Sequence, residues 1–244
     1  MMLPSGSKQR FLCLHGLHQN KKVFQAKLSA IIDRFRRNED IEFTFLNGAY
    51  VVPPKILQDV HKAHRLKRVK VPKKENSRFQ KRTVVFEDYR GWWNPWVGQG
   101  CLDGVLRPVL HELCKGGVTG VIGFSQGAAL AHLLCCSSVA TKLGWSPSKV
   151  IFSGGFVGKV ELSGKCFAGD MMISGVQTLH IWGETDLVIP MDKSKDLYNK
   201  FQLPIGHIDG SDDKPHTFYQ HPSGHSIPVS DSALVDAIEA FIRK

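Results

Sequence analysis

Short apolar segments alternate with amphipathic ones along this chain, and this pattern most limits how it can fold. The apolar segments are four to six residues long, which suits strands that are buried on both faces. Six of them are predicted to be strands, at residues 11–15, 41–46, 118–123, 150–153, 178–182 and 217–220. The intervening segments carry apolar residues at helical spacing and predict helices at 23–35, 102–113, 125–136, 191–201 and 232–242.

Strands that alternate with helices predict an α/β fold, with a parallel sheet that is covered by helices on both faces. Right-handed crossovers and double winding favour the strand order 2-1-3-4-5-6. We expect the 244 residues to form one domain, residues 1–244. In this strand order, ligands bind at the carboxyl ends of the first and third strands, beside the point where the winding reverses.

The turn after the third predicted strand, Gly123-Phe-Ser-Gln-Gly127, matches the G-x-S-x-G pattern of a nucleophile elbow. A strand precedes it and a helix follows, which is the context in which such a turn exposes a serine oxygen. We therefore expect Ser125 to be a nucleophile, and the backbone N–H of Gln126 to face a developing negative charge. A tight glycine turn without chemistry is the alternative.

A nucleophilic serine needs a base and a carboxylate, which in this fold class follow it in the order acid, then histidine. Asp186 comes directly after the fifth predicted strand and is the predicted acid, with Glu184 as the competing carboxylate. His225 lies in the loop before the last helix and is the predicted base. His221 in the same region is the alternative base, and is otherwise expected to end the sixth strand.

One segment, from Lys55 to Arg82, holds almost all of the net positive charge. It contains eleven Lys and Arg and two acids, so it contributes +9 of the formal +10 of the chain. The rest is nearly neutral, which is not typical of a nucleic-acid-binding protein, and we expect no specific nucleic acid partner. We predict a basic insertion or flap at about residues 53–90, which is either a solvated loop or a contact for an anionic membrane surface or a nuclear-import receptor.

Three tryptophans, Trp92, Trp93 and Trp96, follow the basic segment and are expected near the same edge of the sheet as Ser125. They either line an apolar binding site for an acyl substrate or pack against the body and anchor the insertion. His15, at the end of the first strand, is predicted to support the loop that follows it.

Several classes of site are disfavoured by the motifs that the sequence lacks. His111-Glu112 is not followed by the second histidine of H-E-x-x-H, and no glycine-rich nucleotide motif follows a strand, so no metal and no cofactor are predicted. No apolar run is long enough to span a membrane, and no signal pattern stands at the start. The six cysteines show no C-x-x-C spacing and no zinc pattern, and a chain of this length does not need disulfides, so we expect reduced thiols and a cytoplasmic location, with the nucleus as the alternative.

Together these motifs resemble the FSH family of serine hydrolases, a group of α/β-hydrolases. The resemblance is carried in family order by Leu12-Cys-Leu-His-Gly-Leu-His-Gln-Asn20, Arg90-Gly-Trp-Trp93, Gly123-Phe-Ser-Gln-Gly-Ala-Ala129, Gly183-Glu-Thr-Asp-Leu-Val-Ile-Pro190 and Ser223-Gly-His-Ser-Ile-Pro228. It implies an α/β-hydrolase fold and a catalytic triad of Ser125, Asp186 and His225. It also implies an oxyanion hole made by the N–H groups of Leu17 and Gln126. The basic insertion departs from the family pattern.

The resemblance further implies hydrolysis of carboxylic esters, often with fatty acyl chains, without a cofactor. We therefore expect an esterase that cleaves small acyl esters or thioesters through an acyl-enzyme intermediate. An acyl-protein thioesterase that removes palmitoyl groups is the alternative of the same class. A non-catalytic basic adaptor on a hydrolase scaffold is the alternative of another class.

Overall fold

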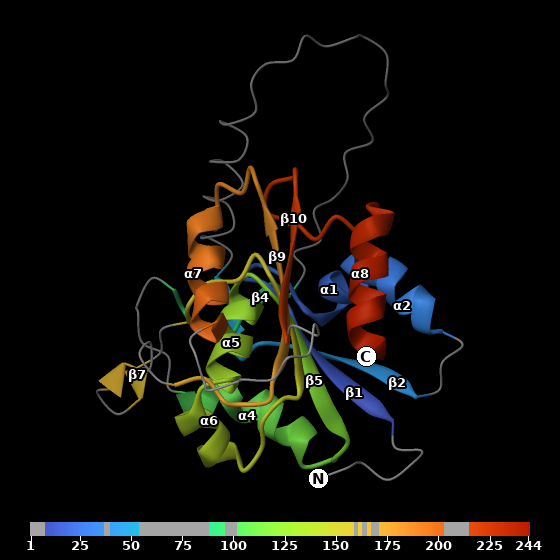
Figure 1. Ribbon diagram of the computed structural model, residues 1–244. Helices are drawn as coiled ribbons and strands as arrows, with labels where there is room; N and C mark the ends of the chain where they lie inside the picture. The colour runs from blue at the N-terminus through green and yellow to red at the C-terminus, as the bar shows by residue number, and fades with distance from the viewer. Residues whose placement is uncertain are drawn as a thin grey trace.

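The computed structural model describes residues 8–36, 40–53, 88–95, 102–158, 161–162, 165–166, 171–202 and 215–244. Figure 1 shows a twisted central sheet with helices on both of its faces. The basic segment from Lys55 to Arg82 lies outside the described residues, and so does Trp96. The prediction of a flap at about 53–90 therefore stays a prediction.

Six parallel strands form the central sheet in the order β2-β1-β5-β6-β9-β10. Their bounds are β1 Gln9–Leu14, β2 Ile41–Leu46, β5 Val118–Phe124, β6 Lys149–Ser153, β9 Gln177–Gly183 and β10 His216–His221. These are the six predicted strands, each within two residues of its predicted bounds, and their order is the predicted 2-1-3-4-5-6. The doubly wound parallel α/β fold is confirmed.

Seven helices of the described residues divide between the two faces of the sheet. On one face lie α1 (Lys21–Lys27), α2 (Ser29–Phe35) and α8 (Ser232–Arg243), and on the other lie α4 (Leu102–Leu113), α5 (Gln126–Leu134), α6 (Ser137–Leu143) and α7 (Met191–Gln202). Neighbouring residues of a strand point to opposite faces. In β1, Phe11 and Cys13 pack with the first set of helices, whereas Leu12 and Leu14 pack with the second.

Two helix predictions need correction. The helix predicted at 23–35 is two helices, because Leu28 leaves the helical conformation with φ −94° and ψ 10°. Leu28 is buried and is neither Gly nor Pro, so nothing in the sequence pattern marks the break. The helix predicted at 125–136 begins one residue later and ends at Leu134, and a separate helix, α6, follows it.

Two short antiparallel pairs lie outside the central sheet: β3 (Tyr50–Val51) with β4 (Arg90–Gly91), and β7 (Glu161–Leu162) with β8 (Lys165–Cys166). The first pair joins the residues on either side of the basic segment. It also contacts the loop after β1, because the Arg90 N–H donates to the Gln19 carbonyl oxygen at 2.7 Å. The residues that follow the basic segment are thus held at the carboxyl edge of the sheet, where the site described next is formed.

Candidate active site

Ser125 lies in a strained turn between β5 and α5. Its backbone angles are φ +53° and ψ −117°, and a positive φ is uncommon for any residue other than glycine. The flanking glycines allow this turn, because a Cβ at Gly127 would collide with the Leu14 carbonyl. The Ser125 N–H donates to the Ser153 carbonyl oxygen at 2.9 Å, which ties the turn to β6. Backbone strain held in this way is concentrated at functional sites.

Asp186 and His225 are joined by a short hydrogen bond, in which His225 Nδ1 donates to Asp186 Oδ2 at 2.6 Å. The other carboxylate oxygen of Asp186 accepts the N–H groups of Val188, at 2.8 Å, and Ile189, at 2.9 Å. Both oxygens are therefore bonded, and the carboxylate is held in one orientation. An ionised carboxylate can only accept, so this bond places a proton on Nδ1 of His225 and leaves Nε2 as the ring nitrogen that does not face Asp186.

The His225 ring is seated against residues next to Ser125. It packs on the ring of Phe124, with 4.8 Å between the ring centroids. Gly154, which follows β6 and has φ +52°, lies against the same ring: a Cβ there would be 3.0 Å from His225 Cε1. Gly154 was not among the predicted site residues, and its only sequence signal is the Gly154-Gly155 pair after the fourth predicted strand.

The two competing residues do not form this pair. His221 is the last residue of β10 and is buried, as expected for a residue that ends the strand. Glu184 accepts a hydrogen bond from Gln220 Nε2 at 2.8 Å. Of the two carboxylates and two histidines that the sequence offered, the structure joins Asp186 to His225.

Leu17 and Gln126, the two residues expected to form an oxyanion hole, come from the loops after β1 and β5. The first loop lies on the elbow, since a Cβ at Gly16 would be 3.2 Å from Ser125 Cβ. Gln126 is the first residue of α5, where backbone N–H groups have no partner within the helix. The structure therefore brings both loops to Ser125.

Trp92 is only 1% exposed, and its indole N–H donates to the His15 carbonyl oxygen at 2.8 Å. An enclosed indole cannot line an open binding site, so the structure favours the packing alternative for Trp92 and corrects its assignment as a substrate contact. Trp93 is partly buried against the core on the α4 and α5 side of the sheet. Trp96 lies outside the described residues, and its role stays a prediction.

His15 has the supporting position predicted for it. Its ring is fully buried and stacks on Trp92, with 5.2 Å between the ring centroids. Burial lowers the pKa of His15 to about 4, so the ring is neutral at physiological pH. Its Nδ1 donates to the Gly16 carbonyl oxygen at 2.7 Å, and its Nε2 accepts the Gly48 N–H at 3.0 Å. The ring therefore links the loop after β1 to the loop after β2.

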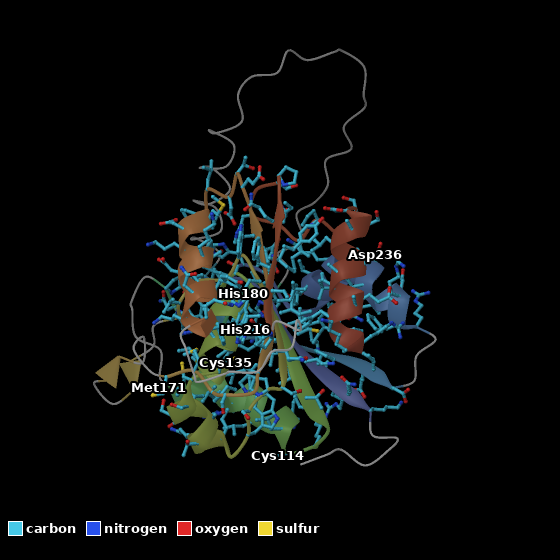
Figure 2. The ribbon with its side chains drawn as sticks, in the orientation of Figure 1. Cys114, Cys135, Met171, His180, His216 and Asp236 are labelled. Atoms are coloured by element: carbon cyan, nitrogen blue, oxygen red, sulfur yellow. The ribbon has the colours of Figure 1, made fainter. Side chains whose placement is uncertain are left out.

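Two other histidines lie close together but away from the candidate site. His180 of β9 and His216 of β10 are labelled in Figure 2, and both interact with the Thr178 hydroxyl oxygen at 3.0 Å. Thr178 and His216 stand at the beginnings of their strands, whereas Ser125, Asp186 and His225 follow strand ends. Burial lowers the pKa of His180 to about 3, which makes it a neutral core residue.

A hollow of about 650 Å³ lies near the amino ends of β1 and β5, whereas Ser125 follows the carboxyl end of β5. It is lined by Lys8, Arg10, Glu42, Thr44, Glu112, Lys115, Gly116 and Gly117. Its charges bind one another: Arg10 contacts Glu112 at 3.0 Å, and Lys115 contacts Glu112 at 2.8 Å. The hollow therefore contributes nothing to the candidate site.

The described part of the chain contains neither a cluster of metal ligands nor a helix suited to a membrane. No three His, Cys, Asp or Glu side chains there gather in a way that could hold a metal ion. None of the helices described there combines the length and apolar character that crossing a membrane requires.

The chain is similar to known serine hydrolases and esterases. The family described as serine hydrolase (FSH1) matches residues 2–237. The esterase OVCA2 of Danio rerio is 27% identical over 239 residues, which cover 91% of this chain and 92% of that protein. The esterase OVCA2 of Homo sapiens is also 27% identical, over 91% of this chain and 90% of that protein.

Solved structures of low sequence identity share the fold. The chain matches Arabidopsis thaliana SOBER1 with a TM-score of 0.57 and 15% identity, covering 97% of this chain and 98% of that one. It matches the Bacillus cereus carboxylesterase with a TM-score of 0.56 and 12% identity, covering 97% of this chain and 88% of that one. Because the family match covers nearly the whole sequence, the chain belongs to the FSH1 family of serine hydrolases.

Proposed function

We propose that the protein is an esterase in which Ser125, His225 and Asp186 form a catalytic triad. The observation that carries the proposal is the 2.6 Å bond between His225 and Asp186, formed beside the strained turn of Ser125. The three residues follow three different strands, β5, β9 and β10, and the carboxyl ends of these parallel strands lie on one side of the sheet. The relatives that are named esterases support hydrolysis of carboxylic esters as the reaction.

The first half of the proposed reaction forms an acyl-enzyme. Nε2 of His225 takes the proton of Ser125 Oγ while that oxygen attacks the ester carbonyl carbon. Asp186 keeps the proton on Nδ1 and stabilises the imidazolium that results. The tetrahedral intermediate collapses, His225 gives its proton to the departing alcohol or thiol, and the acyl group remains on Ser125.

The second half of the reaction removes the acyl group. A water molecule gives a proton to His225 and attacks the acyl carbon, and the carboxylic acid leaves as Ser125 recovers its proton. In both halves the negative oxygen is held by the N–H groups of Leu17 and Gln126. Losing one such donor typically costs about 10²–10³ in rate, so the two loops must be held rigidly.

The leaving group is the finer part of the proposal. We infer small acyl esters as substrates and expect thioesters to be cleaved more slowly, because the relatives are named esterases. An acyl-protein thioesterase would show the reverse preference. Comparing oxygen esters and thioesters of the same acyl chain therefore separates the two candidates.

The proposal is tested by measuring the hydrolysis of esters of increasing acyl length. The wild-type protein is expected to turn them over, and the Ser125→Ala variant to fall to the background rate. The matched control is Ser148→Ala, because Ser148 is an exposed serine that bonds Thr119 at the opposite edge of the sheet. Undiminished turnover by Ser125→Ala would refute the triad, and inactivity of the wild-type protein on every ester and thioester would favour the adaptor alternative.

A further inference from the structure

The side chain of Gln126 makes two hydrogen bonds to the backbone of a loop that is distant in sequence. Its Oε1 accepts the Trp92 N–H at 2.8 Å, and its Nε2 donates to the Trp93 carbonyl oxygen at 2.9 Å. The residue is 4% exposed, so water does not compete strongly for these bonds. The amide thus uses one acceptor and one donor to hold a single stretch of backbone, residues 92–93.

The same stretch is also bonded to the loop after β1. The Trp92 indole N–H donates to the His15 carbonyl oxygen at 2.8 Å, and its ring stacks on the neutral His15 ring. His15 directly precedes Gly16 and Leu17, which lie on the elbow. Residues 92–93 therefore connect the loop that carries Leu17 with the residue that carries the second oxyanion N–H.

Gly91, which directly precedes Trp92, lies beside the side chains of both Leu17 and Gln126. A Cβ at this position would be 2.7 Å from Leu17 Cδ1 and 2.9 Å from Gln126 Oε1. The ends of the Leu17 and Gln126 side chains therefore lie beside residue 91, and a side chain at this position would have to displace both of them. The contact with Leu17 adds to the hydrogen bonds of Gln126 and involves the same junction.

We propose that Gln126, Trp92 and His15 are positioning residues that fix the distance between the backbone N–H groups of Leu17 and Gln126. The inference rests on the proposed function, because it assigns those two N–H groups to the oxyanion. The parallel ladder between β1 and β5 aligns the strands only as far as Leu14 and Gly123. Beyond that point, the side-chain bonds to residues 92–93 set how the two loops face each other.

This role predicts a loss of rate rather than a loss of substrate binding. Misplacing a reacting group by about 1 Å can cost about 10² in rate, and removing one oxyanion donor costs about 10²–10³. A donor that is displaced but still present should cost less rate than a donor that is removed, so we expect kcat to drop about 10- to 100-fold. KM should change by less than about twofold, because the substrate carbonyl carries little charge before the transition state.

The test is the Gln126→Met variant, which keeps the backbone N–H and the approximate shape of the side chain but neither hydrogen bond. Its matched control is Gln220→Met, because the Gln220 amide also accepts one bond, from Trp182 Nε1 at 3.1 Å, and donates one, to Glu184 at 2.8 Å. The measurements are kcat, KM, the unfolding midpoint and the inhibition constant of a trifluoromethyl ketone, which forms a tetrahedral oxyanion adduct with an active serine.

A positioning role predicts that the inhibition constant of the ketone rises in Gln126→Met by about the same factor as kcat/KM falls. Gln220→Met should match the wild type in both values. A purely structural role would lower the unfolding midpoint of Gln126→Met but leave kcat and the inhibition constant of the folded protein unchanged, and this result would overturn the inference.

A second variant tests the inference if Gln126→Met does not fold. Trp92→Phe removes the indole bond to His15 together with part of the buried ring, and we expect it to lower kcat by about fivefold to tenfold. Its control is Trp145→Phe, because the Trp145 indole N–H donates to the Val118 carbonyl oxygen at the opposite edge of the sheet. Equal kcat values in these two variants would refute the inference. An active Ser125→Ala variant would instead refute the proposed function.

Discussion

Replacing Gly154 with alanine tests whether the position of the His225 ring limits the rate. Gly154 has φ +52° and follows β6, and its N–H donates to the Ile181 carbonyl oxygen at 2.8 Å. An alanine Cβ would be 3.0 Å from His225 Cε1 and 3.2 Å from His225 Nδ1. The ring already packs on Phe124 and is bonded to Asp186, so it must shift to make room.

Two separate effects of this substitution can be estimated. The left-handed backbone costs alanine about 1–2 kcal/mol, and the smaller entropy of the unfolded chain returns about 0.4–1 kcal/mol, which leaves a net loss of stability of about 1 kcal/mol. An ordinary carbon contact is about 3.5–4.0 Å, so the ring must move by about 0.5 Å. Since a 1 Å misplacement costs about 10² in rate, we expect kcat/KM to fall roughly tenfold.

The matched control is Gly144→Ala. Gly144 ends α6 with φ +61°, and a Cβ there would meet no atom within 4 Å, so this variant carries the same backbone strain without the contact. Both variants should lose similar stability in urea unfolding, whereas only Gly154→Ala should lose activity toward a short ester. Equal kcat/KM values in the two variants would refute the argument that the position of the His225 ring limits the rate.

Three further predictions concern the acid, the buried histidines and the basic segment. Asp186→Asn is expected to fold but to lower kcat by about 10³–10⁴, because an amide cannot hold His225 in the required tautomer; steady-state kinetics and circular dichroism check this. Burial lowers the pKa of His15 and His132 to about 4 and that of His180 to about 3, so the unfolded chain binds more protons below pH about 6.5. The free energy of unfolding should therefore fall as the pH drops from about 6.5 toward 4, by at most about 1.4 kcal/mol per pH unit for each histidine. A free energy of unfolding in urea that stays constant over that range would contradict the argument. Deleting residues 60–80 should leave hydrolysis of a short neutral ester unchanged and reduce cosedimentation with anionic vesicles at low salt; equal binding by both proteins would contradict a membrane contact.

The sequence was sufficient to predict the four central strands because strands buried on both faces must be apolar throughout. β1, β5, β6 and β9 are almost entirely buried, and their apolar runs are bounded by glycine or polar turns. The break between α1 and α2 could not be predicted, since Leu28 is apolar and fits the helical pattern on both sides. β3 and β4 are two residues each, and their pairing depends on contacts between distant parts of the chain rather than on a local pattern.

Within the site, the positions of residues that directly follow strands could be predicted, but the contacts between loops could not. Ser125, Asp186 and His225 each follow a recognisable strand, so their place at one edge could be inferred from the order of elements. Two other features could not be inferred in this way: the contact of the His225 ring with Gly154, and the bonds of the Gln126 side chain to residues 92–93. Both depend on how loops that are distant in sequence pack together. The burial of Trp92 was left open by the sequence, because an aromatic residue suits either a core or a binding site.

The central claim, that Ser125 is a nucleophile activated by His225, is tested most directly by covalent labelling with a fluorophosphonate, which reacts with activated serines. After labelling, digestion and mass spectrometry of the peptides identify the modified residue. We predict a single adduct on the peptide that contains Ser125, and loss of that adduct in His225→Ala with the fold retained. Labelling of a different serine, or equal labelling of Ser125 in His225→Ala, would contradict the account.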